Sequence, residues 1–204
     1  VWAMGEQLKC GDFVPFVFEH KFNMEVGDGD RKQLMSGTID RVDICENGTD
    51  VYVRIIDYKT GKKDFNIVKT YYGIDIQLMV YMEAAMKLVA KMRPGKNVIP
   101  AGVFYYNISD PIVSATTESA DEIEDKIKGE LRLKGMVNSD KDIAEKMDNT
   151  EGTSLNIPVS RKADGGFDSR RSKVMNTEQF NMLGRFVDVR AVDTADRIAG
   201  SACG

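Results

Sequence analysis

The sequence predicts an α/β domain in which a central mixed β-sheet of four to five strands is flanked by helices. Two neighbouring segments rich in β-branched residues, 37–43 and 55–59, are typical of strands. A long segment with helical period follows them, and another apolar, strand-like segment comes next at 99–106. A chain of 204 residues is long enough to bury a core of this kind in one globular domain.

The first two strands are expected to form a hairpin, because the sequence Glu-Asn-Gly-Thr at 46–49 carries a strong turn signal. With Asn-Gly as a two-residue loop, Asp40 lies opposite Ile55 and Asp57 is its diagonal neighbour. Side chains alternate along a strand, so Asp57 and Lys59 point to the face that Asp40 joins. A three-residue loop would break this arrangement, whereas a four-residue loop would restore it.

Two carboxylates and a lysine on one face are the minimum equipment for metal-dependent cleavage of a phosphodiester. Asp40 and Asp57 would repel each other unless a cation lay between them, and oxygen ligands suit Mg²⁺ or Mn²⁺. Lys59 would supply a positive charge near the attacking water or the phosphate. The alternative is that the three are solvated strand residues with a surface salt bridge. The metal interpretation is favoured because these charges interrupt an apolar strand.

The segment from about residue 67 to 92 is predicted to be one long amphipathic helix, since its apolar residues recur at three- and four-residue steps. Arg-Pro-Gly at 93–95 ends it. Gln77 and Tyr81 lie four residues apart on one side of this helix and could approach the same spot. The alternative is that Tyr81 belongs to the core and Gln77 to its boundary.

Three motifs in this region resemble those of a known family. GTIDRVD at 37–43, IIDYKTGKK at 55–63 and YYGIDIQLMVYMEAA at 71–85 are similar to the second, third and fourth motifs of PD-(D/E)xK nucleases. The resemblance is greatest to the nuclease domain of the AddB subunit of bacterial AddAB helicase–nucleases, with RecB-type exonucleases as wider relatives. It implies a restriction-endonuclease-like core over 13–107, followed over 108–204 by a helical region with a long loop.

This resemblance also implies a chemistry and a set of residues. The family hydrolyses DNA with Mg²⁺, for which Mn²⁺ is expected to substitute. The implied role is that of an exodeoxyribonuclease acting on DNA unwound by a partner helicase, in double-strand break repair by recombination. The implied metal ligands are Asp40, Asp57 and the backbone carbonyl of Tyr58, with Lys59 as the catalytic lysine and Gln77 and Tyr81 matching a QxxxY pattern.

Two features of the family are not evident here. A helix before the first strand normally adds a further metal ligand, but no such helix is evident before Phe13, so Glu19 and His20 are the nearest candidates. His20 shares its strand parity with phenylalanines, which favours a boundary position. AddB-type domains also carry an iron–sulfur cluster on four cysteines. That cluster is not expected in this chain, whose three cysteines, Cys10, Cys45 and Cys203, include no CxxC pair.

The expected partners are DNA and an AddA-like helicase–nuclease subunit. The formal net charge of −4 is unhelpful for binding nucleic acid, so the distribution of charge matters more than the sum. Lys62 and Lys63 follow the second strand, and Arg170 and Arg171 lie in the Gly-, Ser- and Asp-rich segment 149–174. These four are candidates for DNA phosphates if the two clusters fold together. The second cluster could equally be a solvated loop.

The chain is interpreted as one nuclease domain over 1–204, excised from a longer helicase–nuclease subunit. Shorter helices are expected at about 119–128 and 141–146, and a second long helix opens at Thr177. The sequence shows no targeting peptide or transmembrane run, and scattered cysteines fit a reduced, bacterial cytoplasm. Two alternatives to a nuclease are a catalytically silent relative that grips or guides DNA, and an unrelated acidic-substrate binding module.

Overall fold

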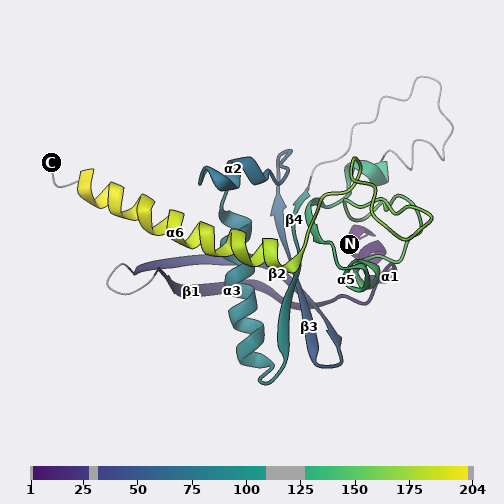
Figure 1. The fold of residues 1–204 in the computed structure, drawn as a ribbon, viewed down its shortest axis with the longest axis horizontal. Coiled ribbons are helices and arrows are strands. Elements are labelled where there is room, and N and C mark those ends of the chain that lie inside the picture. Colours follow the sequence, from purple (N-terminus) through teal and green to yellow (C-terminus); the bar gives the residue numbers. More distant parts are fainter. Residues whose placement is uncertain (1, 28–31, 109–126, 202–204) are drawn as a thin grey trace.

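The computed structural model describes residues 2–27, 32–108 and 127–201. They form one mixed sheet of six strands in the order β1-β2-β3-β4-β5-β6, in which β3 with β4 and β5 with β6 are parallel and the other pairs are antiparallel (Figure 1). The strands are β1 (Val14–Val26), β2 (Gln33–Asn47), β3 (Asp50–Lys59), β4 (Asn97–Asn107), β5 (Lys134–Asn138) and β6 (Val174–Met175). The expected count of four to five was too low, because β6 has two residues and shows no alternating pattern.

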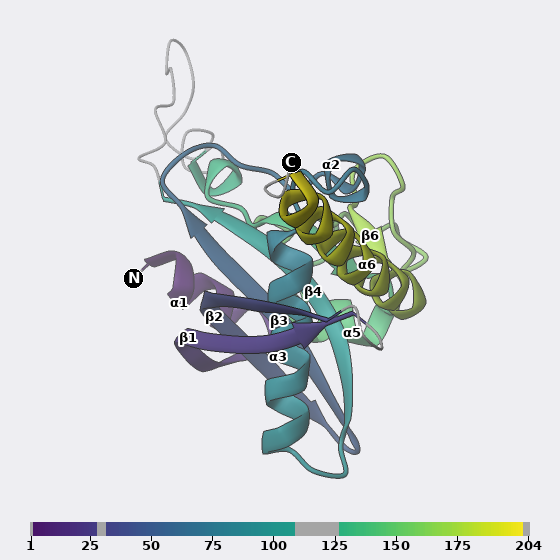
Figure 2. The same ribbon diagram turned by 90° about the vertical axis from the view of Figure 1, so that its left-hand side faces the viewer.

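Helices cover both faces of this sheet. They are α1 (Trp2–Lys9), α2 (Ile67–Tyr71), α3 (Gln77–Met92), α5 (Lys141–Met147) and α6 (Thr177–Ser201). The apolar sides of α3 and α6 pack on one face with Val53 and Ile55 of β3 (Figure 2). On the other face α5 packs over Ile56 and Phe104, in a second core. The described helices include none long and apolar enough to cross a membrane.

The hairpin between β2 and β3 turns one residue later than expected. Asn47 pairs with Asp50, so the loop is Gly48-Thr49 rather than Asn47-Gly48. Gly48 has φ 60° and Thr49 does not have a positive φ, which is the pattern of a turn that needs glycine at its first position. The predicted pairing of Asp40 with Ile55 was therefore wrong, since Val42 takes that position.

The new register keeps both aspartates on one face. The last pair of the β2–β3 ladder is Arg41 with Ile56, which brings Asp40 level with Asp57 beyond it. A shift of two residues preserves the alternation of faces, whereas a shift of one would reverse it.

The long helix predicted over 67–92 is interrupted. It ends as α2 at Tyr71, and α3 starts at Gln77 after a turn in which Gly73 has φ 74°. That backbone conformation is easily adopted by glycine and stops a right-handed helix. The three- and four-residue spacing persists across the turn, so the sequence pattern alone did not reveal the break.

Other predicted helices had mixed outcomes. Residues 141–147 form α5, and α6 begins at Thr177 as expected. The helix expected at about 119–128 lies mostly in 109–126, outside the described residues. The expectation of no helix before Phe13 was wrong, because α1 occupies residues 2–9. The segment 149–174 is irregular apart from two isolated bridges and the start of β6.

Candidate active site

Asp40 lies where the ladder between β2 and β3 ends. Its Oδ2 accepts a hydrogen bond of 2.7 Å from the backbone N–H of Tyr58. This side-chain oxygen thus takes the place of a backbone carbonyl of β2 as the acceptor for β3. The bond fixes the carboxylate of Asp40 beside β3. Because Arg41 pairs with Ile56 at the end of the ladder, Asp40 stands level with Asp57 on the neighbouring strand.

Asp57 is almost completely buried, with a side chain that is 3% exposed. Its Oδ2 lies 2.6 Å from Nζ of Lys59, but no described group meets the geometry of a hydrogen bond to this oxygen. Burial raises the pKa of Asp57 above its ordinary value, although Lys59 opposes this, and repulsion from Asp40 adds to the rise. The fold therefore holds a carboxylate that lacks full compensation of its charge.

These two carboxylates fit a divalent cation. Mg²⁺ typically takes one or two protein carboxylates and completes its coordination with waters and phosphate oxygens. Asp57 offers an oxygen with no hydrogen bond, and Asp40 offers the oxygen that Tyr58 does not occupy. In the part of the chain that the structure describes, no group of three or more acidic, histidine or cysteine side chains could hold a metal. The aspartate pair is thus the candidate centre.

The two further candidates from sequence lie on β1. Glu19 falls between the pairs of Phe18 with Arg41 and His20 with Ile39, which places it level with Asp40. It is exposed and has φ 48°, a left-handed conformation that is uncommon for glutamate. His20 is half-buried. A metal role for either residue stays a prediction, as does one for the Tyr58 carbonyl.

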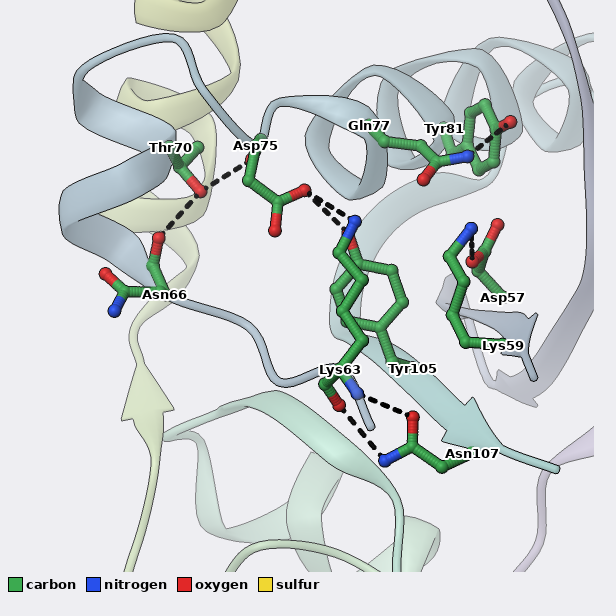
Figure 3. A network of polar contacts seen from close by, with 10 residues as sticks. All are labelled: Asp57, Lys59, Lys63, Asn66, Thr70, Asp75, Gln77, Tyr81, Tyr105 and Asn107. Carbon is green, nitrogen blue, oxygen red and sulfur yellow. Dashed lines mark hydrogen bonds and ion pairs between the residues drawn. The ribbon is translucent and has the colours of Figure 1, made fainter. Parts of the chain in front are cut away.

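Gln77 and Tyr81, at the N-terminal end of α3, are drawn above Asp57 and Lys59 in Figure 3. Nε2 of Gln77 donates a hydrogen bond of 2.9 Å to the hydroxyl of Tyr81, so the two residues act as one unit. The Tyr81 ring packs edge-on against Phe22 of β1 at 5.7 Å. Gly37 of β2 permits this approach, because a Cβ there would lie 2.9 Å from the Phe22 ring and 3.3 Å from Tyr81.

A second layer of polar contacts extends the site away from Lys59 (Figure 3). The Tyr105 hydroxyl donates 2.8 Å to Oδ1 of Asp75, and Nζ of Lys63 lies 3.1 Å from the same oxygen. The ammonium groups of Lys63 and Lys59 stand 4.4 and 5.6 Å from the centroid of the Tyr105 ring. Burial and the neighbouring Asp75 raise the pKa of Tyr105, so this hydroxyl stays a donor. Oδ1 of Asn107 accepts a hydrogen bond of 3.0 Å from the backbone N–H of Lys63, and Nδ2 of Asn107 donates one of 3.1 Å to the carbonyl of Lys63.

Sequence reasoning did not identify Asp75, Tyr105 or Asn107. A signal was present for Tyr105, because it shares a strand face with Val103 and interrupts an apolar run. Asp75 contacts Tyr105, which lies 30 positions away, and no local sequence pattern predicts such a pairing.

An open hollow of about 380 Å³ lies next to this cluster, at the N-terminal end of α3. Its wall combines polar groups of the site with apolar side chains of β1, β2 and the α2–α3 turn. The lining includes Lys63, Asp75, Gln77, Tyr81, Phe22 and Ile74. A phosphate group can therefore reach the polar end of α3 from solvent.

The two basic segments predicted to hold phosphates lie side by side. Lys173 forms an ion pair with Asp64, which joins the segment around 170–173 to the one around 62–64. Lys62 is 85% exposed and lies 3.8 Å from Glu130, and Arg170 and Arg171 are exposed. The side chains are thus placed as a rim, while their binding of phosphate stays a prediction.

The opposite face of the same strands holds a buried charge network. Nη2 of Arg54 lies 2.8 Å from Oδ2 of Asp43 but, like Oδ2 of Asp57, does not meet the geometry of a hydrogen bond. Asp43 accepts two bonds of 2.6 and 2.7 Å from Arg41 and one of 2.9 Å from Arg54. All three residues are 0–1% exposed. Gln7 of α1 bonds Arg41 at 3.2 Å, and Arg54 lies 4.9 Å from the centroid of the Phe13 ring. Here α1 completes a structural network and faces away from the aspartate pair.

Comparison with known proteins gives a consistent result. The sequence model of the PD-(D/E)XK nuclease superfamily matches residues 1–171. The B subunits of the ATP-dependent helicase/deoxyribonucleases from Clostridium botulinum (strain Hall) and Thermoanaerobacter sp. (strain X514) are each 35% identical over 97% of this chain. The protein of the same name from Caldanaerobacter subterraneus is 36% identical over the same share. The chain spans 18% of the length of each of these relatives.

Proposed function

This chain belongs to the PD-(D/E)XK nuclease superfamily, and from that premise we propose that it is an Mg²⁺-dependent deoxyribonuclease. The observation that carries the proposal is the buried Asp57, whose Oδ2 lies 2.6 Å from the ammonium group of Lys59 and which stands level with Asp40 on the neighbouring strand. A fold gains nothing in stability from burying a charge with incomplete compensation. The arrangement is accounted for if a cation and a substrate phosphate complete it.

Each residue then has a distinct task. A bound Mg²⁺ or Mn²⁺ would act as a Lewis acid that makes water a better nucleophile and neutralises phosphate charge. Asp40 and Asp57 would hold this cation, and the N–H of Tyr58 keeps Asp40 in place. Lys59, 27% exposed, directs its ammonium group toward the attacking water or the phosphate. Gln77 and Tyr81 hold the substrate against them from α3.

The substrate we propose is DNA made single-stranded by a partner motor, degraded from its end. The names of the relatives join helicase and deoxyribonuclease in one protein. On this basis the chain is the nuclease domain of a longer subunit that works with an AddA-like helicase–nuclease in the cytoplasm, in recombinational repair. Lys62, Lys63, Arg170 and Arg171 would hold flanking phosphates. No iron–sulfur cluster is proposed for residues 1–204 themselves.

The test is cleavage of single-stranded DNA with Mg²⁺ by the intact protein that carries this chain, together with its partner subunit. Lys59→Ala should remove cleavage while metal still raises the melting temperature. Unchanged cleavage by this variant would refute the role of Lys59. A wild-type protein that binds DNA and metal but never cleaves would instead support the silent DNA-guiding alternative.

A further inference from the structure

The turn between α2 and α3 presents apolar side chains to solvent directly beside the candidate active site. Tyr72 is 66% exposed and Ile74 is 74% exposed. Ile74 lines the same hollow as Lys63, Gln77 and Tyr81. Ile67, Val68 and Tyr71 of α2 are also 45–57% exposed, so Tyr72 and Ile74 belong to a run of exposed apolar side chains, which is typical of an interaction surface.

Hydrogen bonds within the turn hold Tyr72 and Ile74 in their exposed positions. The buried hydroxyl of Thr70 lies 3.1 Å from the carbonyl oxygen of Asn66 and 2.9 Å from that of Asp75, which ties the two ends of the turn together (Figure 3). The N–H of Ile74 donates 2.9 Å to the carbonyl of Lys69. Oδ1 of Asn66 also caps α2. The turn is therefore a preorganised surface, which lowers the entropy lost when a ligand binds.

Aromatic rings continue this surface toward α6. The Tyr71 ring stacks on Phe186 at 4.8 Å with an interplanar angle of 1°, and Tyr72 packs edge-on to Tyr71 at 5.5 Å. Arg190 lies 5.3 Å from the centroid of Phe186. Tyr72 is the most exposed ring of the row. Lys69 stands between Asp64 and Asp75, which are paired with Lys173 and Lys63, so three ammonium groups face two carboxylates around this segment.

We propose that Tyr72 and Ile74 form a stacking platform for unpaired bases of single-stranded DNA whose phosphates lie along Lys63 and the aspartate site. This inference rests on the proposed nuclease function. Stacking on an exposed ring tolerates any sequence, because every base has a π-face. A protein segment seated permanently on Ile74 would cover the hollow that leads to Lys63, Gln77 and Tyr81, so a transient nucleic-acid strand is the better occupant.

Site-specific cross-linking tests the platform independently of cleavage. A single-stranded oligonucleotide containing 5-iodouracil is irradiated with the intact protein in EDTA, and the modified peptides are mapped by mass spectrometry. We expect a cross-link at Tyr72 that Tyr72→Ala removes and Tyr72→Phe retains. Absence of any cross-link within residues 66–76 of the wild-type protein would overturn the inference.

Kinetics supply the second readout. Stacking is worth about 1–3 kcal/mol per base, so Tyr72→Ala should raise KM for single-stranded DNA roughly tenfold with little change in kcat. Tyr72→Phe should restore the wild-type KM, and Ile74→Ala should show a smaller rise. Met92→Ala is the matched control, because Met92 is 48% exposed at the other end of α3, about 22 Å from Gln77.

The outcomes separate the two proposals. If the wild-type protein cleaves DNA and Tyr72→Ala matches it in KM and cross-linking, the platform is wrong while the nuclease stands. If the wild-type protein cleaves nothing, the nuclease fails, and a Tyr72 cross-link still supports base binding. If Tyr72→Ala releases the partner subunit and the cross-linking pattern is unchanged, the surface is a protein interface and the platform is overturned.

Discussion

The two faces of the β2–β3 hairpin carry opposite excesses of charge, with two arginines and one aspartate on one face and two aspartates and one lysine on the other. On one face Asp43 is held by Arg41 and Arg54, and every acidic oxygen there has a donor. On the other face Asp57 is as deeply buried, but its Oδ2 has an ammonium group nearby and no hydrogen bond. Burial raises the pKa of Asp57, whereas it lowers that of Arg54 against the attraction of Asp43.

The difference shows that burial and charge do not by themselves mark a functional site. The network around Asp43 is covered by Gln7 and Phe13, and none of its members lines the hollow at the N-terminal end of α3. The network around Asp57 includes Lys59, which is 27% exposed, and the hollow at the N-terminal end of α3 is lined by Lys63, Gln77 and Tyr81. An excess of negative charge with a partly exposed cation separates the candidate reactive carboxylates from the structural one.

The largest expected effect is on catalysis. Asp57→Asn should lower the rate of DNA cleavage by about 10²–10³-fold or more, because the cation and the developing charge lose their principal anionic partner. The variant should remain folded, with an unaltered circular dichroism spectrum. Initial rates on end-labelled single-stranded DNA measure the effect. Cleavage within a few fold of wild type would remove the distinction between the two faces.

Breaking the buried network around Asp43 should affect folding instead. Asp43→Ala leaves two buried arginines without their partner and should cost about 3–5 kcal/mol of unfolding free energy. Urea denaturation measures it. Glu46→Ala is the matched control on the same hairpin, since its 2.8 Å pair with Arg93 is exposed to solvent and its loss should leave the stability almost unchanged. Equal losses for both variants would contradict the assigned structural role of Asp43.

Divalent metal should stabilise the folded protein by binding at Asp40 and Asp57, and not at the network around Asp43. With Mg²⁺ or Mn²⁺ at about 100 times its dissociation constant, the free energy of unfolding should increase by about 2.7 kcal/mol. Asp57→Asn should abolish the rise in melting temperature and Lys59→Ala should preserve it. Differential scanning fluorimetry with and without EDTA distinguishes these cases. A shift that survives in Asp57→Asn would place the metal elsewhere.

The smallest expected effect concerns Lys63, which lines the hollow at the N-terminal end of α3. Lys63→Ala should weaken binding of single-stranded DNA and reduce the magnitude of the slope of log affinity against log salt by about 0.7, the value for one phosphate contact. Lys63→Arg should restore the slope because the positive charge is kept. Fluorescence anisotropy over a salt series measures both. Lys87→Ala, on the outer side of α3, should leave the slope unchanged.

The sequence was sufficient for the relations that depend on local period. Alternation along β2 and β3 placed Asp40, Asp57 and Lys59 on a shared face, and helical spacing placed Gln77 beside Tyr81, as their hydrogen bond confirms. The exact pairing was missed because glycine at position 48 suits two different turns, and the choice between them is made by the whole ladder.

Features set by distant contacts could not be predicted. Arg41 and Arg54 are charged residues of the kind that local patterns place in solvent, yet their partner Asp43 and the cover from Gln7 and Phe13 bury them. The break before α3 depends on Thr70 joining two carbonyls. Asp75 acquires its role only when β4 brings Tyr105 beneath it.

Adjacent residues of one strand, Asp40 and Arg41, serve different faces of the sheet, and this restricts how the hairpin can change length. Inserting or deleting one residue within the paired stretches 41–47 or 50–56 would turn over every side chain beyond it, so an arginine would meet the substrate and an aspartate would enter the sealed interior. Changes in steps of two would keep both faces correct. Viable natural variants should therefore change these paired stretches by even numbers of residues, while the loop at 48–49 is free of this restriction.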